Sequence, residues 1–214
     1  MVKNIFKREK GITGLETAII LIAFVVVAAV FAYTALSAGL FSTQKSQEAV
    51  YSGLKEAQST LELRGGVIAT ANSTGNDGTI KQVSFVVANV LGGEAIDFTP
   101  PTLDTDNTGL AADDSSNVVV INYQDEHQTA NDLYWTIERL GNSDDDNLLE
   151  TDERFQVNIG SDTENESGGN LCDVLSNDLT SKRTFNLEVL TPVGAVLQIE
   201  RTMPAYIDSI INLR

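Results

Sequence analysis

The stretch TAIILIAFVVVAAVFAYTALSAGLFSTQ, residues 17–44, decides the architecture of this chain. It contains no charged residue over 28 consecutive positions, and its apolar part covers residues 17–41. About 20 apolar residues in an α-helix are enough to cross the hydrocarbon core of a bilayer. A globular domain of this size rarely hides a helix that is apolar on every side. The sequence therefore predicts a stage at which this segment lies in a membrane.

The segment that precedes the apolar stretch is basic. Residues 1–11 hold four basic side chains and one acidic side chain, a local charge of +3. Basic residues next to a membrane segment favour retention on the cytoplasmic side. We therefore expect the remainder of the chain to face outward.

Three interpretations of this N-terminal region compete. An ordinary signal peptide has an apolar stretch of about 7–15 residues before a small-residue cleavage site, and Ala35-Leu36-Ser37 is a candidate site. A permanent single-pass anchor accounts better for the length of the apolar stretch. The third interpretation is cleavage ahead of the apolar helix, and it depends on the order of basic, glycine, neutral and acidic residues in KREKGITGLETAIILIAF, residues 7–24.

That order resembles the type III signal sequence of type IV pilins and archaellins, in which a membrane peptidase cuts after the glycine. The resemblance implies a signal peptide at residues 1–11, cleavage between Gly11 and Ile12, and Glu16 at the fifth position of the mature chain. In type IV pilins a glutamate at that position pairs with the N-terminal ammonium of a neighbouring subunit. Thr13-x-x-Glu16 also fits a helix capping box, so both roles stay open for Glu16.

Helical periodicity continues beyond the apolar stretch. Val50, Leu54, Ala57 and Leu61 follow spacings of four, three and four residues, which is one face of a helix. Gly65-Gly66 then forms a helix stop. We expect one helix over residues 12–64, roughly 75 Å long at about 1.5 Å per residue. Its apolar half is rich in alanine and other small residues, which favour close helix–helix contact, so we expect the filament-like packing of many copies.

Residues 67–214 change to the alternating pattern of β-strands. Phe155, Val157 and Ile159 illustrate the period of two, and turn-forming Gly, Asn, Asp and Ser separate the candidate strands. The candidate strands are 67–71, 80–90, 95–99, 117–123, 133–140, 154–159, 184–190 and 195–202. This pattern predicts an α+β chain, a long N-terminal helix followed by a β-sandwich or barrel, with Phe85, Tyr134 and Trp135 in the core.

Both ends of the chain carry a further family resemblance. PVGAVLQIERTMPAYIDSIINLR, residues 192–214, resembles the closing hairpin and tail of archaellins, and QKSQEAVYSGLKEAQSTLELRG, residues 44–65, is similar to the corresponding archaellin helix. Bacterial type IV pilins end differently. The resemblance covers roughly residues 1–70 and 184–214.

Composition excludes several other functions. The formal net charge is −16, and because residues 1–11 contribute +3, residues 12–214 carry −19. Such an acidic chain repels nucleic-acid phosphates. Cys172 and His127 are the single cysteine and histidine, which excludes an internal disulfide and a Cys/His zinc cluster. No nucleophile motif or phosphate-binding loop is present, so we expect no enzymatic activity and no required cofactor.

The acidic segment NSDDDNLLETDE, residues 142–153, has the ligand spacing of a calcium loop. Its candidate oxygen ligands are Asn142, Asp144, Asp146, the Leu148 carbonyl, Glu150 and Glu153. The alternative is a solvated acidic turn in an acidic protein. A weaker partial copy lies at residues 104–109 and lacks an acid at the twelfth position.

Two N-glycosylation sequons are present, at Asn72-Ser73-Thr74 and Asn165-Glu166-Ser167, both expected in polar loops. The archaellin resemblance raises the expectation that Asn72 and Asn165 carry glycans.

The resemblance implies a structural subunit of the archaeal swimming filament, the archaellum, located outside the cell after a membrane-bound precursor stage. Its implied partners are other copies of itself, a prepilin-type peptidase, and the assembly ATPase with its membrane platform. A cell-surface adhesion pilin processed in the same way is the alternative function. A membrane-anchored extracellular binding domain that retains residues 1–11 is a third.

Overall fold

The computed structural model describes residues 12–58, 60–90, 94–160, 169–193 and 196–213. The chain divides into two compact units, Met1–Ser52 and Gly53–Arg214. The described part of the first unit is entirely helical, and the second contains all the β-sheets.

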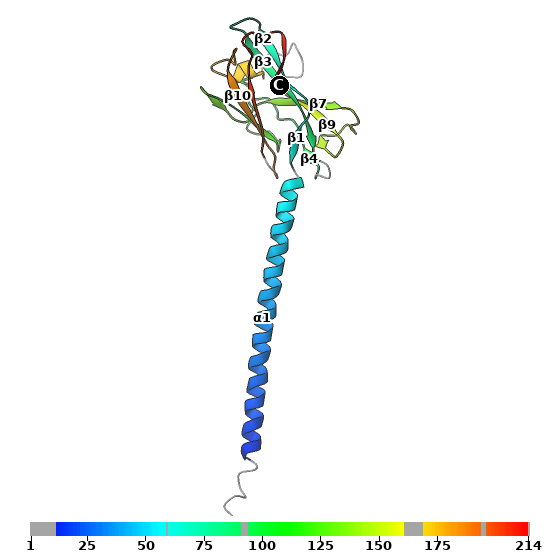
Figure 1. The fold of residues 1–214 in the computed structure, drawn as a ribbon, viewed down its shortest axis with the longest axis vertical. Coiled ribbons are helices and arrows are strands. Elements are labelled where there is room, and N and C mark those ends of the chain that lie inside the picture. Colours follow the sequence, from blue (N-terminus) through cyan, green and yellow to red (C-terminus); the bar gives the residue numbers. More distant parts are fainter. Residues whose placement is uncertain (1–11, 59, 91–93, 161–168, 194–195, 214) are drawn as a thin grey trace, which may run out of the picture. The chain divides into compact units, whose positions relative to one another are not determined.

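Helix α1 spans Ile12–Gln58, 47 residues without interruption (Figure 1). Its length is about 70 Å at about 1.5 Å per residue. The hydroxyl groups of Thr34 and Thr43 donate to the carbonyls of Phe31 and Leu40, at 3.0 and 2.8 Å. These local bonds satisfy polar side chains in and next to the apolar stretch without a partner from elsewhere in the chain.

The predicted C-terminal end of the helix, residue 64, is wrong. Helix α1 ends at Gln58, and Leu61–Leu63 forms strand β1, which pairs antiparallel with β3 (Thr79–Asn89). Leu61, placed on the helical face by its spacing, is instead 4% exposed within the β core. The sequence Leu61–Leu63 has the alternating pattern of a strand. Burial of Leu61 and the backbone hydrogen bonds to β3 therefore favour a strand here over a further turn of helix.

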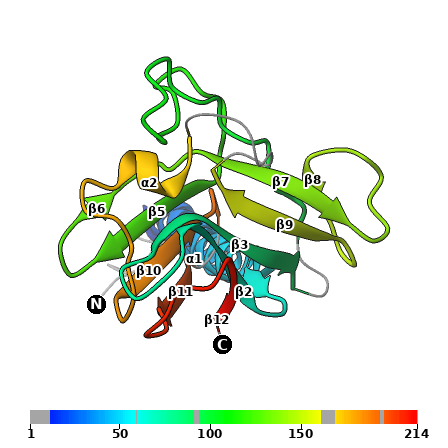
Figure 2. The same ribbon diagram turned by 90° about the horizontal axis from the view of Figure 1, so that it is seen from above.

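The β unit is a sandwich of two antiparallel sheets (Figure 2). One sheet has the order β12-β2-β3-β9-β7, with β1 also paired to β3. The other has the order β11-β10-β5-β6. The strand bounds are β2 Val67–Ser73, β5 Val120–Asp125, β6 Thr129–Ala130, β7 Trp135–Leu140, β9 Arg154–Ile159, β10 Thr184–Leu190, β11 Leu197–Thr202 and β12 Ile210–Leu213. A small pair, β4 (Ile96–Asp97) with β8 (Leu148–Leu149), and a short helix α2 (Leu171–Val174) complete the unit.

The inner faces of both sheets form one apolar core. Trp135 and Phe155 each contact Phe98 edge to face, with ring centroids 5.9 and 6.0 Å apart. Tyr123 and Phe185 stack at 6.0 Å, and all five rings are at most 1% exposed. Edge-to-face and offset pairs stabilise a core beyond the area they bury.

The predicted α+β class and β-sandwich are confirmed. Each predicted strand has a counterpart, although 95–99 shortens to β4 and 117–123 shifts to β5. Phe85 and Trp135 lie in the core as expected, whereas Tyr134 is only half-buried. The prediction did not include β12, whose four residues pair with β2 and bury Leu213.

Candidate assembly helix and surface sites

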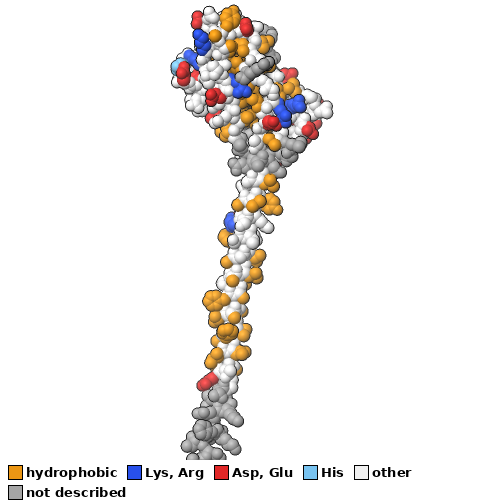
Figure 3. Space-filling model, viewed as in Figure 1, with side chains coloured by type: hydrophobic (Ala, Val, Ile, Leu, Met, Phe, Trp, Pro, Cys, Tyr) orange, Lys and Arg blue, Asp and Glu red, His pale blue; other side chains and the backbone are white. Residues whose placement is uncertain are grey.

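Helix α1 presents an apolar surface that its own chain leaves exposed. The large apolar side chains from Leu15 to Phe41 have exposed fractions between 52% and 74%. Figure 3 shows hydrophobic side chains along this helix. Within the described residues, Gly14–Leu54 is one helix long and apolar enough to cross a membrane, by length and composition, and none of its apolar window is buried within the chain.

Small residues alternate with the large ones along this surface. Ala28 and Ala29 follow Val25–Val27, and Ala32, Ala35 and Gly39 continue the series. The backbone of a helix can approach a second helix closely where side chains are small. The part of the helix after Phe41 is polar and solvated. Lys45 and Glu48 form an exposed ion pair there, with 2.6 Å between Nζ and Oε2. The helix therefore combines a packing surface with a solvated surface.

The predicted cleavage position lies at the boundary of the residues that the structure describes, so cleavage there stays a prediction. Ile12 is the first residue of the helix, and Gly11 lies outside the described residues. Glu16 is exposed in the first turns, and no hydrogen bond or ion pair joins it to another described residue. The pairing and capping-box interpretations of Glu16 both stay predictions.

The carboxylates of the 142–153 loop are engaged with the backbone of the loop. Glu153, only 6% exposed, accepts hydrogen bonds from the amides of Asp144 and Glu150, at 3.2 and 3.0 Å. Asp144 accepts from the amide of Asp146, and Asp146 accepts from the amide of Leu148 at 2.7 Å. Among the described residues, no three Asp, Glu, His or Cys side chains form a group placed to hold a metal ion. Calcium binding stays a prediction for this loop, whose first residue, Asn142, lines an open hollow together with Arg64 and Arg154.

The partial copy at residues 104–109 is a tight turn. Asp104 accepts from the amide and the hydroxyl of Thr108, at 2.8 and 2.7 Å. Asn107 adopts a φ of 56°, in the left-handed region that Asn tolerates. These contacts give Asp104 a structural role in closing the turn.

The two sequons differ in their setting. Asn72 lies in β2 rather than in a loop, at a β-bulge between the pairs Ala71–Ile80 and Ser73–Thr79. Its side chain is exposed, and its amide is 3.5 Å from the Thr79 hydroxyl. Asn165 lies outside the described residues. The position of Asn72 leaves its amide nitrogen accessible to a modifying enzyme.

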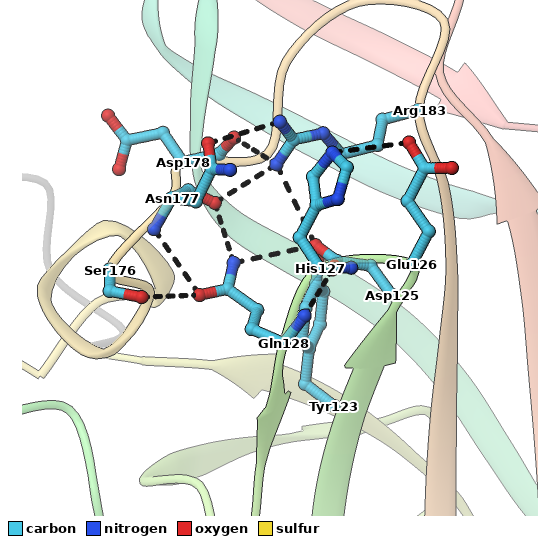
Figure 4. Close-up of polar contacts among 9 residues, drawn as sticks. All are labelled: Tyr123, Asp125, Glu126, His127, Gln128, Ser176, Asn177, Asp178 and Arg183. Carbon is cyan, nitrogen blue, oxygen red and sulfur yellow. Dashed lines mark hydrogen bonds and ion pairs between the residues drawn. The ribbon is translucent and has the colours of Figure 1, made fainter.

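Sequence reasoning missed a buried polar network on the four-stranded sheet (Figure 4). The Asp125 carboxylate accepts bonds from the Tyr123 hydroxyl at 2.8 Å, the His127 amide at 2.7 Å and the Gln128 amide at 2.9 Å. Burial alone would raise the pKa of Asp125, but these hydrogen bonds lower it below its ordinary value. Burial and the Asp125 carboxylate together raise the pKa of Tyr123.

Arg183 connects this network to the segment after α2. Its guanidinium lies 3.8 Å from the Asp125 carboxylate and donates to the carbonyls of Asn177 and Asp178 at 3.1 and 3.0 Å. Asp125 and Arg183 are 58 positions apart in the sequence, so no local motif could reveal the pair. His127 lies at the edge of this network with an exposed side chain, 3.2 Å from Glu126. The network therefore holds the β5–β6 hairpin against the start of β10.

Comparisons with known proteins agree with the helix and the sandwich. The sequence matches the archaeal-type flagellin family over residues 11–201. A probable flagellin 1 from Archaeoglobus fulgidus is 39% identical, over 97% of this chain and 96% of the relative. A chain from the archaeal flagellum of Methanospirillum hungatei strain JF1 is 30% identical with a TM-score of 0.60, covering 94% of this chain and 98% of that chain. The crystal structure of archaeal flagellin FlaB1 from Methanocaldococcus jannaschii, 11% identical, shares the fold with a TM-score of 0.52, covering 72% of this chain and 95% of that one.

The family match therefore spans the apolar helix and nearly all of the β-sandwich, and a relative at 39% identity aligns with almost the full length of both chains. This chain belongs to the archaeal-type flagellin family.

Proposed function

We propose that this chain is a structural subunit of an archaeal flagellum, the archaellum, and that copies of it assemble into the extracellular helical filament used for swimming. The observation that carries this proposal is the apolar surface of α1, which one chain leaves exposed from Leu15 to Phe41. Helices of other copies supply the missing cover. The similarity to a chain of the Methanospirillum hungatei flagellum, which spans 98% of that chain, supports the same function.

Before assembly, α1 lies in the cell membrane as part of a precursor. A prepilin-type peptidase then cuts between Gly11 and Ile12, which removes the basic segment and keeps the apolar helix. Support comes from the order of basic, glycine, neutral and acidic residues in residues 7–24, which leads directly into the apolar part of α1. Cleavage behind the helix, as in an ordinary signal peptide, would remove the surface that assembly needs.

Glu16 pairs with the N-terminal ammonium that cleavage creates on a neighbouring subunit. Support comes from its exposure and from the apolar residues that follow it along α1. A lone carboxylate carries a high desolvation cost in apolar surroundings, and an opposite charge at hydrogen-bond distance offsets that cost. The pair thereby sets the register between neighbouring helices.

Assembly requires an energy source outside this chain. Transfer of α1 from lipid into a helical bundle exchanges one apolar environment for another, so hydrophobic burial supplies little net free energy. We infer that an assembly ATPase with a membrane platform extracts the subunits. The chain itself has a structural role and no catalytic one.

Glycosylation at Asn72, and at Asn165, is part of the proposal for the mature filament. An exposed asparagine at a β-bulge can enter a modifying active site, because the local ladder is already interrupted. Calcium binding by the 142–153 loop is also proposed. An ion there would take oxygens from Asp144, Asp146 and Glu150, and Glu153 would exchange its amide partners for the metal. The adhesion pilin alternative is not favoured, because the family and the similar chains are flagellins.

Electron microscopy and N-terminal sequencing of filaments sheared from cells test the proposal. We expect this chain to be present in the filaments and to start at Ile12. A start at Met1 would indicate a permanent anchor, and a start near Ala38 would indicate an ordinary signal peptide. Replacement of Gly11 by Phe should leave precursor in the membrane and no filaments, whereas Gly11→Ala should retain partial cleavage.

A further inference from the structure

Two cross-strand rows on the outer face of the six-stranded sheet contain no ionisable side chain. Paired residues of an antiparallel sheet point to the same face. Asn212 pairs with Ile68, which pairs with Ser84, and Ile210 pairs with Thr70, which pairs with Gln82. We call these six residues the uncharged face. The positions between them, such as Ala69 and Val83, are fully buried in the core.

The uncharged face also exposes apolar side chains at the edge of its sheet. Ile210 is 68% exposed and Ile68 is 39% exposed, on the neighbouring strands β12 and β2. Towards the middle of the sheet the face is closed, because Ser84 on β3 and its partner Asn158 on β9 are buried, so its accessible part lies on β12 and β2. Strand β12 is the terminal strand of its sheet. An exposed edge with apolar side chains is a surface that proteins usually cover.

Charged side chains lie on the same sheet outside the uncharged face, because Glu138 on β7 and Arg154 on β9 are exposed at outer positions. The opposite sheet carries charge as well. Its outer face holds Glu188, bonded by Gln198 at 3.2 Å, and the exposed Glu200 on β11. These carboxylates belong to a chain with a formal net charge of −16. Copies that approach through carboxylate-bearing faces repel each other and must desolvate charges. Contact through the uncharged face brings neither charge repulsion nor desolvation of carboxylates.

We propose that the uncharged face is a contact between β units of neighbouring copies of this chain, an inference that rests on the proposed filament function. A second copy is the occupant because it is the partner that a filament supplies at high local concentration. Desolvation of Ile68 and Ile210 favours the contact, and the neighbouring Thr70 and Asn212 side chains form hydrogen bonds without charge repulsion. Since a helical filament uses heterologous contacts, the face meets a different surface of the next copy.

Thiol labelling in intact filaments tests the contact directly. Cys172 is first replaced by serine, because it is the single native cysteine. Ile210→Cys and Thr202→Cys are then introduced separately; Thr202 is an exposed residue on β11, the edge strand of the opposite sheet. We expect maleimide to label residue 210 about ten-fold more slowly in filaments than in detergent-dissociated subunits, because an interface core excludes water. Residue 202 should label at similar rates in both states.

Charge insertion gives a second measurement. Ile210→Glu and Ile210→Lys should both reduce the yield of sheared filaments, while Thr202→Glu should leave it unchanged. Equal labelling of residue 210 in filaments and free subunits would overturn the inference, as would normal assembly of both Ile210 variants. Assembly of the lysine variant alone would overturn the uncharged character of the contact. Absence of filaments from the Cys172→Ser parent and from the unmodified chain would instead refute the proposed function.

Discussion

The β unit of this chain buries its large apolar side chains, whereas α1 exposes them. In the β unit, Trp135, Phe98 and Phe155 have no exposed surface, and the sandwich buries its own core. In α1, side chains of similar size such as Phe24 and Phe31 are 73% and 70% exposed. Folding of the β unit is therefore complete within one chain, whereas the apolar side chains of α1 must be covered by lipid or by other copies. Folding and assembly should therefore respond to different substitutions.

The largest expected effect separates assembly from folding. Replacement of Ala28 by Trp should abolish filaments, because a large side chain prevents close approach between helices. The processed subunit should remain in the membrane with its β unit folded, and cells should not swim. Immunoblots of membrane and filament fractions, with swimming assays, measure these outcomes.

Ala28→Ser is the matched control, since it keeps a small side chain at the same position, and it should assemble. Filaments of normal width from the Ala28→Trp variant would refute the account of α1 as the main contact.

A core substitution should show the reverse pattern. Trp135→Ala should lower the free energy of unfolding of the β unit by about 3–5 kcal/mol, because it removes a buried ring and leaves a cavity. Membrane insertion of α1 should not change. Circular dichroism melts of detergent-solubilised subunits report the first effect, and membrane fractionation reports the second.

Tyr206→Ala serves as the surface control, because Tyr206 is 53% exposed, and its melt should stay close to that of the parent. An unchanged melt for Trp135→Ala would contradict the closed core described above.

The polar network around Asp125 makes the stability of the β unit depend on pH. The folded-state pKa of Asp125 is lowered, so its stabilising contribution is complete above its unfolded pKa of about 3.9 and is lost as pH falls through the folded-state pKa. Asp125→Asn should lower stability by about 1–3 kcal/mol at neutral pH and flatten the acid limb of the profile.

Melting temperatures measured from neutral to strongly acidic pH test this expectation, with the exposed Asp113→Asn as a control of equal charge change. A profile that keeps the same acid slope without Asp125 would exclude this carboxylate as its source.

The smallest expected effect concerns the 142–153 loop. Glu153→Gln leaves one acceptor oxygen for two amides, which should cost about 1 kcal/mol and a few degrees of melting temperature. This loss should persist in a chelator, because the backbone bonds need no metal.

Calcium should separately raise the melting temperature of the parent, and Asp144→Asn with Asp146→Asn should remove that increase. A parent whose melting temperature ignores calcium would eliminate the metal site and leave an acidic turn.

The sequence predicted the existence of α1 but not the residue at which it ends. A charge-free run of 28 residues predicts a long apolar helix, whereas Leu61 fits a helical face and a strand equally well. The choice depended on β3, whose residues pair with those of β1 from 24 to 28 positions away along the chain. Periodicity in one segment carries no information about such a distant partner.

The surface sites show the same limit. Spacing placed Glu153 among calcium ligands, but its carboxylate accepts two backbone amides of its own loop. The Asp125–Arg183 pair had no sequence signal, because its members belong to segments joined only by the fold. Residue type predicted the polarity of these sites, and tertiary contacts decided what each polar group binds.

The exposed surface of α1 has a consequence for the lifetime of an assembled filament. Burial of a large apolar side chain is worth about 1.5–3 kcal/mol, and fifteen such side chains lie between Leu15 and Phe41. If the filament buries all of these side chains, a subunit that escaped into water would lose roughly 20–45 kcal/mol by this estimate, so spontaneous exchange with the surrounding medium is negligible. A damaged subunit therefore does not leave the filament by escape into the surrounding water.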